Sequence, residues 1–181
     1  MTPTSNPWFT LGVDDLVLAR AKRGDAAAHE KLFRVFATEV HTLARRLSRT
    51  AEDAEDVVQE TFLEVLRSLP RFRGDGSLAG WVRRVAASKA LQRLRRHRGH
   101  ETIDDEDGHF ATTSRAAEPI VARVDLDAAL SRIGDTSRAV VWLHDVEGYS
   151  HEEIAEMMGR TASFSKSQLA RAHARLRQHL A

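Results

Sequence analysis

The sequence predicts an all-α protein in which two small helical domains are joined by a flexible linker. Apolar residues recur every three or four positions over most of the chain, which is the spacing of a helix that buries one face. No segment alternates apolar and polar residues as a half-buried strand would. A polar stretch, residues 98–124, separates the two periodic parts and is longer than the usual connection inside a compact domain.

The first domain is expected over residues 14–97, after a loose N-terminal arm, residues 1–13. Its four helices are predicted over 14–22, 26–48, 51–69 and 78–97, with helix starts at Asp14 or Asp15, Asp25, Thr50 and Ser77. Thr50 and Asp53 form a variant capping box, and Pro70 ends the third helix. The positions expected to be buried are Leu32, Phe33, Phe36, Val40, Leu43, Ala44, Leu47, Val57, Val58, Phe62, Val65, Leu66, Leu69, Leu78, Trp81, Val82, Val85, Ala86, Ala90 and Leu94.

The second domain is expected over residues 125–181. A helix from Asp125 is closed by Gly134, and Thr136 or Ser137 begins another, which ends near Gly148. The apolar positions of these two helices are Leu126, Ala129, Leu130, Ile133, Val140, Val141, Leu143 and Val146.

The segment 148–177 predicts a helix-turn-helix. Ser150 and Glu153 form a capping box, and Gly159 supplies a left-handed helix end. Thr161 or Ser163 then caps a basic second helix that could enter a DNA major groove. The apolar faces of the two helices are Ile154, Met157 and Met158, and Leu169, Ala172 and Leu176.

Charge is segregated along a chain whose net charge is only +1. Residues 52–64 hold six acids and no base, whereas residues 83–100 hold seven bases and no acid. Acids near a helix start are favoured by the helix dipole, which accounts for Glu52 and Asp53 better than for Asp56 or Glu60. The segregation indicates distinct surfaces for distinct partners.

Several classes of protein are excluded by what the sequence lacks. There is no cysteine, so disulfides and thiolate chemistry are excluded. No HExxH or Gly-rich phosphate motif appears, and His97 and His100 are interpreted as solvated, so we expect neither an enzyme nor a cofactor. No secretory signal and no apolar span of about 18 residues is visible, which favours a soluble cytoplasmic protein without membrane insertion.

Three segments resemble the extracytoplasmic-function (ECF, group IV) sigma factors of the sigma-70 superfamily. DAEDVVQETFLEVL resembles their polymerase-binding helix, and FRGDGSLAGWVRRVAASKALQRLRR resembles their promoter-melting segment. GYSHEEIAEMMGRTASFSKSQLARAHARLR resembles their −35 reading hairpin. The resemblance implies a sigma region 2-like domain at 14–97 and a region 4-like domain at 125–181.

The resemblance implies three partners: core RNA polymerase, promoter DNA and an anti-sigma factor or other regulatory protein. The implied polymerase-binding residues are Asp53, Glu55, Asp56, Gln59 and Glu60. The implied −10 residues are Phe72, Arg73, Ser77, Arg83, Arg84, Ser88, Lys89, Gln92, Arg95 and Arg96, with Arg93 as a further phosphate-neutralising arginine. The implied −35 residues are Ser163, Phe164, Lys166, Ser167, Gln168, Arg171 and Arg175.

The chain departs from the family pattern at several of these positions. Ser88 stands where the family usually has Asn, and Gln92 where it has Asp; Phe164, Ser165 and Gln168 replace the usual Thr, Val and Arg. Arg reads guanine, whereas Gln prefers adenine N6 and N7, so the promoter preference is expected to differ. Phe72 is interpreted either as a stacking platform for a base or as a core plug, and Trp81 as core.

Two alternatives accompany this interpretation. A helix-turn-helix regulator acting without polymerase would explain the basic helices but would leave the acidic helix and the linker without a role. Within the linker, the acids at 104–107 are interpreted either as a mimic of nucleic-acid charge inside the polymerase channel or as part of a solvated spacer.

Overall fold

The computed structural model describes residues 6–98, 128–130 and 132–180 of the 181-residue chain. All regular elements in these ranges are helical, as the sequence predicts. The chain divides into two compact units, residues 1–93 and 94–181. The predicted linker and the predicted helix start at Asp125 lie outside the described residues. Within the described ranges, no helix has the length and apolarity needed to cross a bilayer.

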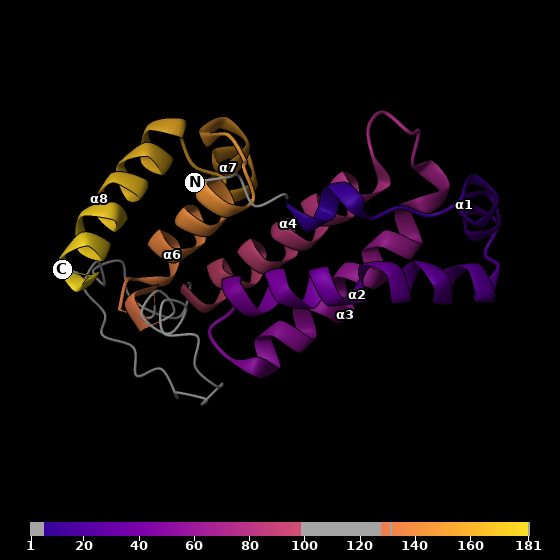
Figure 1. The fold of residues 1–181 in the computed structure, drawn as a ribbon, viewed down its shortest axis with the longest axis horizontal. Coiled ribbons are helices and arrows are strands. Elements are labelled where there is room, and N and C mark those ends of the chain that lie inside the picture. The colour runs from indigo at the N-terminus through magenta and orange to yellow at the C-terminus, as the bar shows by residue number, and fades with distance from the viewer. Residues whose placement is uncertain (1–5, 99–127, 131, 181) are drawn as a thin grey trace. The chain divides into compact units, whose positions relative to one another are not determined.

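The first unit is built from η1 (Pro7–Thr10), α1 (Asp15–Lys22), α2 (Ala26–Leu47), α3 (Ala51–Ser68), η2 (Leu69–Arg71) and α4 (Leu78–Arg98) as far as Arg93. α2 and α3 lie side by side (Figure 1). The predicted caps are confirmed. Asp14 accepts from Leu16 N, Asp25 from Ala28 N, Thr50 from Asp53 N and Ser77 from Gly80 N, at 2.7–3.0 Å. Each cap satisfies an N–H that the first helical turn leaves without an intrahelical partner.

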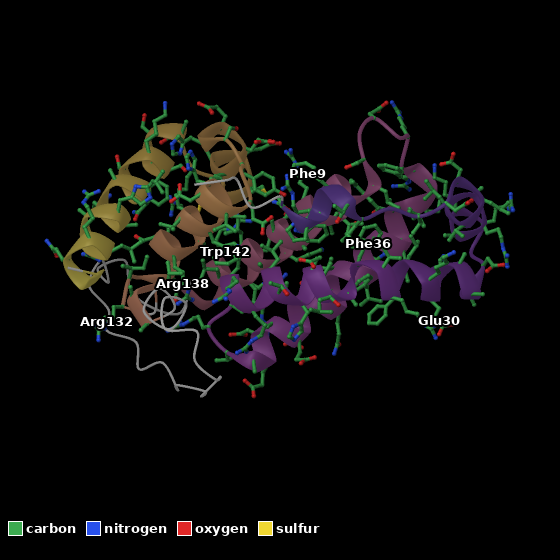
Figure 2. All side chains as sticks on the ribbon, viewed as in Figure 1. Phe9, Glu30, Phe36, Arg132, Arg138 and Trp142 are labelled. Atoms are coloured by element: carbon green, nitrogen blue, oxygen red, sulfur yellow. The ribbon has the colours of Figure 1, made fainter. Side chains whose placement is uncertain are left out.

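The core of this unit lies where the predicted apolar faces of the helices meet. Phe36, on the inner face of α2, is 1% exposed, and Val57 and Val82 are fully buried on α3 and α4 (Figure 2). Phe33 was expected in this core but is 48% exposed; it lies beside the buried face of α2, with its ring 4.6 Å from that of Phe62 between centroids. Val58, Leu66, Leu78, Trp81 and Val85 are half-buried.

The N-terminal segment is not loose where the structure describes it. Trp8 is 2% exposed, and its backbone N–H donates to the Asn6 side chain, which caps η1. The next residue, Phe9, is 78% exposed, with the Arg83 guanidinium 6.0 Å from its ring centre. The prediction of a loose arm is therefore wrong for Trp8, whose large apolar surface is removed from water by packing that periodicity does not reveal.

After the last residues of α4, the described part of the second unit continues with buried Ala129, Leu130 and Ile133. α6 (Asp135–Val141) follows Gly134, and Thr136 and Ser137 are buried inside the helix, so the predicted cap at these residues is wrong. A π-helical turn, η3 (Trp142–Val146), continues α6. The wider turn changes the angle between successive side chains. Val146, expected in the core, is consequently 49% exposed.

The helix-turn-helix consists of α7 (His151–Met158) and α8 (Ala162–Leu180). Both bonds of the predicted capping box are present: Ser150 N donates to Glu153 at 2.9 Å, and Glu153 N to Ser150 at 3.2 Å. Gly159 ends α7 in the left-handed conformation, at φ +61°, and Thr161 caps α8 by accepting from Phe164 N. The predicted apolar faces of both helices are buried, which confirms the hairpin.

Candidate polymerase and nucleic-acid interfaces

The acidic residues of α3 divide into two sets. Glu55 and Gln59 are exposed, whereas Asp53, Asp56 and Glu60 face Arg93 of α4. Arg93 Nε donates to Asp53 Oδ1 at 2.7 Å, one terminal nitrogen donates to Asp56, and the other lies 3.6 Å from Glu60. The Asp53 hydrogen bond, helped by the charges of Asp56 and Glu60, raises the pKa of Arg93 above its ordinary value despite burial.

This arrangement corrects two expectations. Asp53 is 7% exposed and its carboxylate accepts from Arg93, so little of it is accessible to a partner. The Arg93 side chain is 22% exposed and engaged by three carboxylates, so it is not placed to neutralise a DNA phosphate. No sequence signal could have found this cluster, because Arg93 and Asp53 are 40 positions apart.

A second ion pair joins α3 and α4. Lys89 Nζ lies 3.4 Å from Glu64, whose carboxylate also accepts from the Ser68 hydroxyl. The Ser68 hydrogen bond, followed by Lys89, lowers the pKa of Glu64. Lys89, expected to contact −10 DNA, therefore already forms an ion pair within its own domain. Next to it, Ser88 and Gln92 are half-buried and lie within 3.4 Å of each other on α4.

An open pocket of about 460 Å³ lies at the start of α4. Its lining is Arg71, Phe72, Arg73, Asp75, Gly76, Ser77, Gly80, Trp81 and Arg84. Phe72 and Trp81 pack together at 5.1 Å between ring centres, and Lys22 donates to the Phe72 carbonyl at 2.6 Å. Trp81, expected as a core residue, is half-buried and lines the pocket because the turn at 72–77 leaves one side of its ring uncovered.

The pocket brings together four residues of the expected −10 set, Phe72, Arg73, Ser77 and Arg84. Of the other expected arginines, Arg95 and Arg96 are exposed on α4, while Arg83 is half-buried. Sequence analysis missed Arg71 and Asp75 as lining residues. The two glycines of the turn, Gly74 and Gly76, both with positive φ, were the available signal that the chain here folds back on itself.

The expected −35 residues extend along α8 from Ser163 to Arg175. Ser163, Lys166, Ser167 and Arg171 are exposed, whereas Phe164, Gln168 and Arg175 are half-buried. The Ser137 hydroxyl of α6 donates to Gln168 Oε1 at 2.9 Å. A bidentate contact with adenine uses the same oxygen as an acceptor, so in Gln168 one of its two lone pairs is already engaged by Ser137. The Arg160 guanidinium lies 5.7 Å from the Phe164 ring centre.

Known proteins match both units. The family model Sigma-70 region 2 matches residues 32–100, and the model Sigma-70, region 4 matches residues 123–176. The ECF RNA polymerase sigma factor SigM of Mycobacterium tuberculosis is 37% identical over 163 residues, which cover 90% of this chain and 82% of that protein. RNA polymerase sigma factor CarQ of Myxococcus xanthus is 32% identical, with 90% and 95% of the two chains covered.

Solved structures share the fold. The sigma factor RpoE of Bartonella quintana, solved with the anti-sigma factor NepR, has a TM-score of 0.61 at 22% identity and covers 83% of this chain and 95% of that chain. CnrH, solved with the cytosolic domain of CnrY, has a TM-score of 0.55 at 24% identity and covers 92% and 96%.

The two helical units with these matches define a sigma-70-type transcription initiation factor. The chain belongs to the family of ECF RNA polymerase sigma factors.

Proposed function

We propose that this chain binds core RNA polymerase in the cytoplasm, directs it to promoters by reading −10 and −35 elements, and helps to open the DNA without enzymatic activity of its own. The observation that carries the proposal is the order of the matches, with region 2 on the first unit and region 4 on the second. We assign polymerase binding and −10 recognition to residues 14–97 and −35 recognition to residues 125–181.

The proposed polymerase-binding surface is the exposed face of α3. Glu55, Gln59 and Leu63 follow one another at intervals of four, and Leu63 is 64% exposed. Asp56 and Glu60, which also hold Arg93, lie partly exposed beside them. Exposed carboxylates next to an apolar side chain fit a basic partner surface, because charge steers the encounter while apolar contact stabilises the complex.

The proposed −10 site is the pocket at the start of α4. Its volume of about 460 Å³ suits one unpaired base, and the Phe72–Trp81 pair provides an aromatic wall for stacking. Arg73 and Arg84 at its edge can neutralise flanking phosphates. Capture of the base then offsets part of the cost of taking it out of the duplex.

The proposed −35 reader is the N-terminal half of α8. Ser163, Lys166 and Ser167 are exposed where a recognition helix meets base edges, and Arg171 and Arg175 follow where it meets phosphates. Phe164 offers an apolar ring suited to a thymine methyl group. Gln168 is assigned to positioning α8 against α6 through Ser137.

A regulatory partner is part of the proposal. RpoE of Bartonella quintana is held by an anti-sigma factor, and we propose that a partner of the same class sequesters this chain.

Reversing charge on α3 tests polymerase binding. Glu55→Lys with Gln59→Lys is expected to weaken binding to core polymerase about tenfold or more, because two contacts to basic groups become repulsive. These positions are preferable to Asp56 and Glu60, where reversal would also disturb Arg93. The measurement is run-off transcription with core polymerase on a randomised promoter library, together with binding titrations.

The control is Glu30→Lys, the same reversal at a residue that points outward from α2 and has a 60% exposed side chain (Figure 2). It is expected to leave transcription unchanged, since its exposed pair with Arg34 contributes little. If the wild-type chain confers no specific start but binds duplex DNA, the regulator without polymerase is the better description.

Phe72→Ala tests base capture. Binding to single-stranded −10 DNA is expected to fall about tenfold, because stacking of a base on an aromatic ring is lost. On an oligonucleotide with an abasic site at the captured position, wild type and variant are expected to bind equally. If the wild type still binds the abasic strand as much more tightly than Phe72→Ala as it binds the intact strand, the effect of Phe72 lies in its packing on Trp81 and not in base stacking.

A further inference from the structure

A cluster of polar side chains lies where η3, α7 and α8 meet. Its members, here called the histidine cluster, are His144, Asp145, His151, Ser165 and His173. The rings of His144 and His151 are stacked, with centroids 4.5 Å apart and planes 20° apart. Asp145 lies 2.8 Å from His144 Nδ1 and 2.6 Å from His173 Nε2, and His151 Nδ1 lies 3.0 Å from the Ser165 hydroxyl.

The His151–Ser165 hydrogen bond joins the first residue of α7 to the first turns of the recognition helix. Ser165 is fully buried, so its hydroxyl needs a partner inside the protein. His151 supplies one, and the bond thereby helps to set how α8 lies against α7. The ECF family pattern usually has valine where Ser165 stands, so the hydroxyl at this position is a departure from that pattern.

Charged groups face His151 from every element around it. They are His144 and Asp145 from η3, Lys166 from α8, and Glu152 from α7 itself, while His173 of α8 contacts Asp145. The His144 ring stacks directly against His151, and Asp145 lies beside His144. A proton on His151 is opposed by the charge of His144, by Lys166 and by the positive end of the α7 dipole.

Burial, followed by the charges of His144 and Lys166, lowers the pKa of His151 below the ordinary value of 6.5. A histidine with a lowered folded-state pKa stabilises the fold fully above its unfolded-state pKa. That contribution is lost as the pH falls from about 6.5 through the folded-state pKa, because the unfolded chain binds the proton more readily. Acid therefore works against the arrangement in which His151 holds Ser165.

We infer that His151 is a proton-sensitive positioning residue for the recognition helix, so that −35 DNA binding weakens as the medium becomes acidic. The DNA-binding part of this inference rests on the proposed function. The expected weakening of DNA binding in acid is opposite to the general effect of acid, which adds positive charge to histidines and so strengthens attraction to phosphates.

His151→Gln tests the inference, because the amide can still bond Ser165 but does not titrate. At constant ionic strength, wild-type affinity for a −35 duplex is expected to fall about fivefold between about pH 7.5 and pH 5.5. The affinity of His151→Gln is expected to change less than about twofold. The affinity of His144→Gln is expected to fall less than that of the wild type, because the charge of His144 no longer opposes a proton on His151. The control, His41→Gln on α2, is expected to behave as wild type. An equal fall in His151→Gln, or wild-type affinity that rises in acid, would overturn the inference.

Proton NMR of the imidazole groups in the DNA-free chain separates this inference from the proposed function. The signal absent in His151→Gln is expected to titrate below the midpoint of an ordinary histidine. A midpoint at or above the ordinary value overturns the inference even if DNA binding is normal. A low midpoint in a chain that binds no −35 duplex at any pH supports the histidine cluster and counts against the proposed function.

Discussion

Arg93→Ala is expected to destabilise the first unit by about 3–5 kcal/mol, because it leaves a buried carboxylate without its cation. Asp53 is 7% exposed, and Asp56 and Glu60 lie close enough to repel it once the guanidinium is gone. Arg93→Lys is expected to recover only part of the loss, because an ammonium cannot reach three carboxylates with the fixed fork of a guanidinium. Urea unfolding followed by circular dichroism measures both changes.

Arg67→Ala is the matched control, since Arg67 is an exposed arginine near the end of α3. Its loss is expected to change the free energy of unfolding by less than about 0.5–1 kcal/mol. A similar small change for Arg93→Ala would contradict the structural role given to the three-carboxylate cluster. Because the cluster joins α3 to α4, its loss is also expected to weaken polymerase binding without any change at Glu55 or Gln59.

Trp8→Ala is expected to cost about 3–5 kcal/mol of the free energy of unfolding, the range found for removing a large aromatic side chain from a core. Trp8 is 2% exposed and is set in place by a capped turn that begins with Pro7. The measurement is thermal and urea unfolding of the full chain, with the transition of the first unit followed by NMR signals of its core methyl groups.

The neighbouring Phe9→Ala is the control for this prediction. Phe9 is also aromatic but is 78% exposed, so its removal is expected to change stability by less than about 0.5 kcal/mol. Equal losses for the two substitutions would mean that Trp8 is not a core residue. A loss confined to Trp8 would establish that the segment before Asp14 is part of the folded domain.

The arginine at position 93 also changes how the acidic run is understood. Composition alone indicates a strongly acidic helix that is open to a partner. In the structure, three of the acids lie against one guanidinium, which offsets one of their three charges, and Glu55 and Gln59 are the exposed polar residues of the proposed surface. The acidic run therefore joins α3 to α4 through Arg93 and also supplies residues of the proposed polymerase-binding surface.

Sequence by itself determined most of the helices and their starts, α6 excepted, together with the helix-turn-helix. The caps at Asp25, Thr50, Ser77 and Ser150 involve partners within three residues, so local spacing contains all the information they need. The burial of α2 and α8 followed from helical periodicity for the same reason, and the order of three motifs was enough to indicate the family.

Tertiary structure decided which side chains meet between helices. Arg93 with Asp53, Ser137 with Gln168, and His151 with Ser165 each join residues 14 or more positions apart. Trp8, Phe33 and Val146 differ from expectation because burial depends on what covers a side chain and on the width of each helical turn. Periodicity specifies the face of a helix that turns inward, but the neighbour that this face meets is set by how the helices pack.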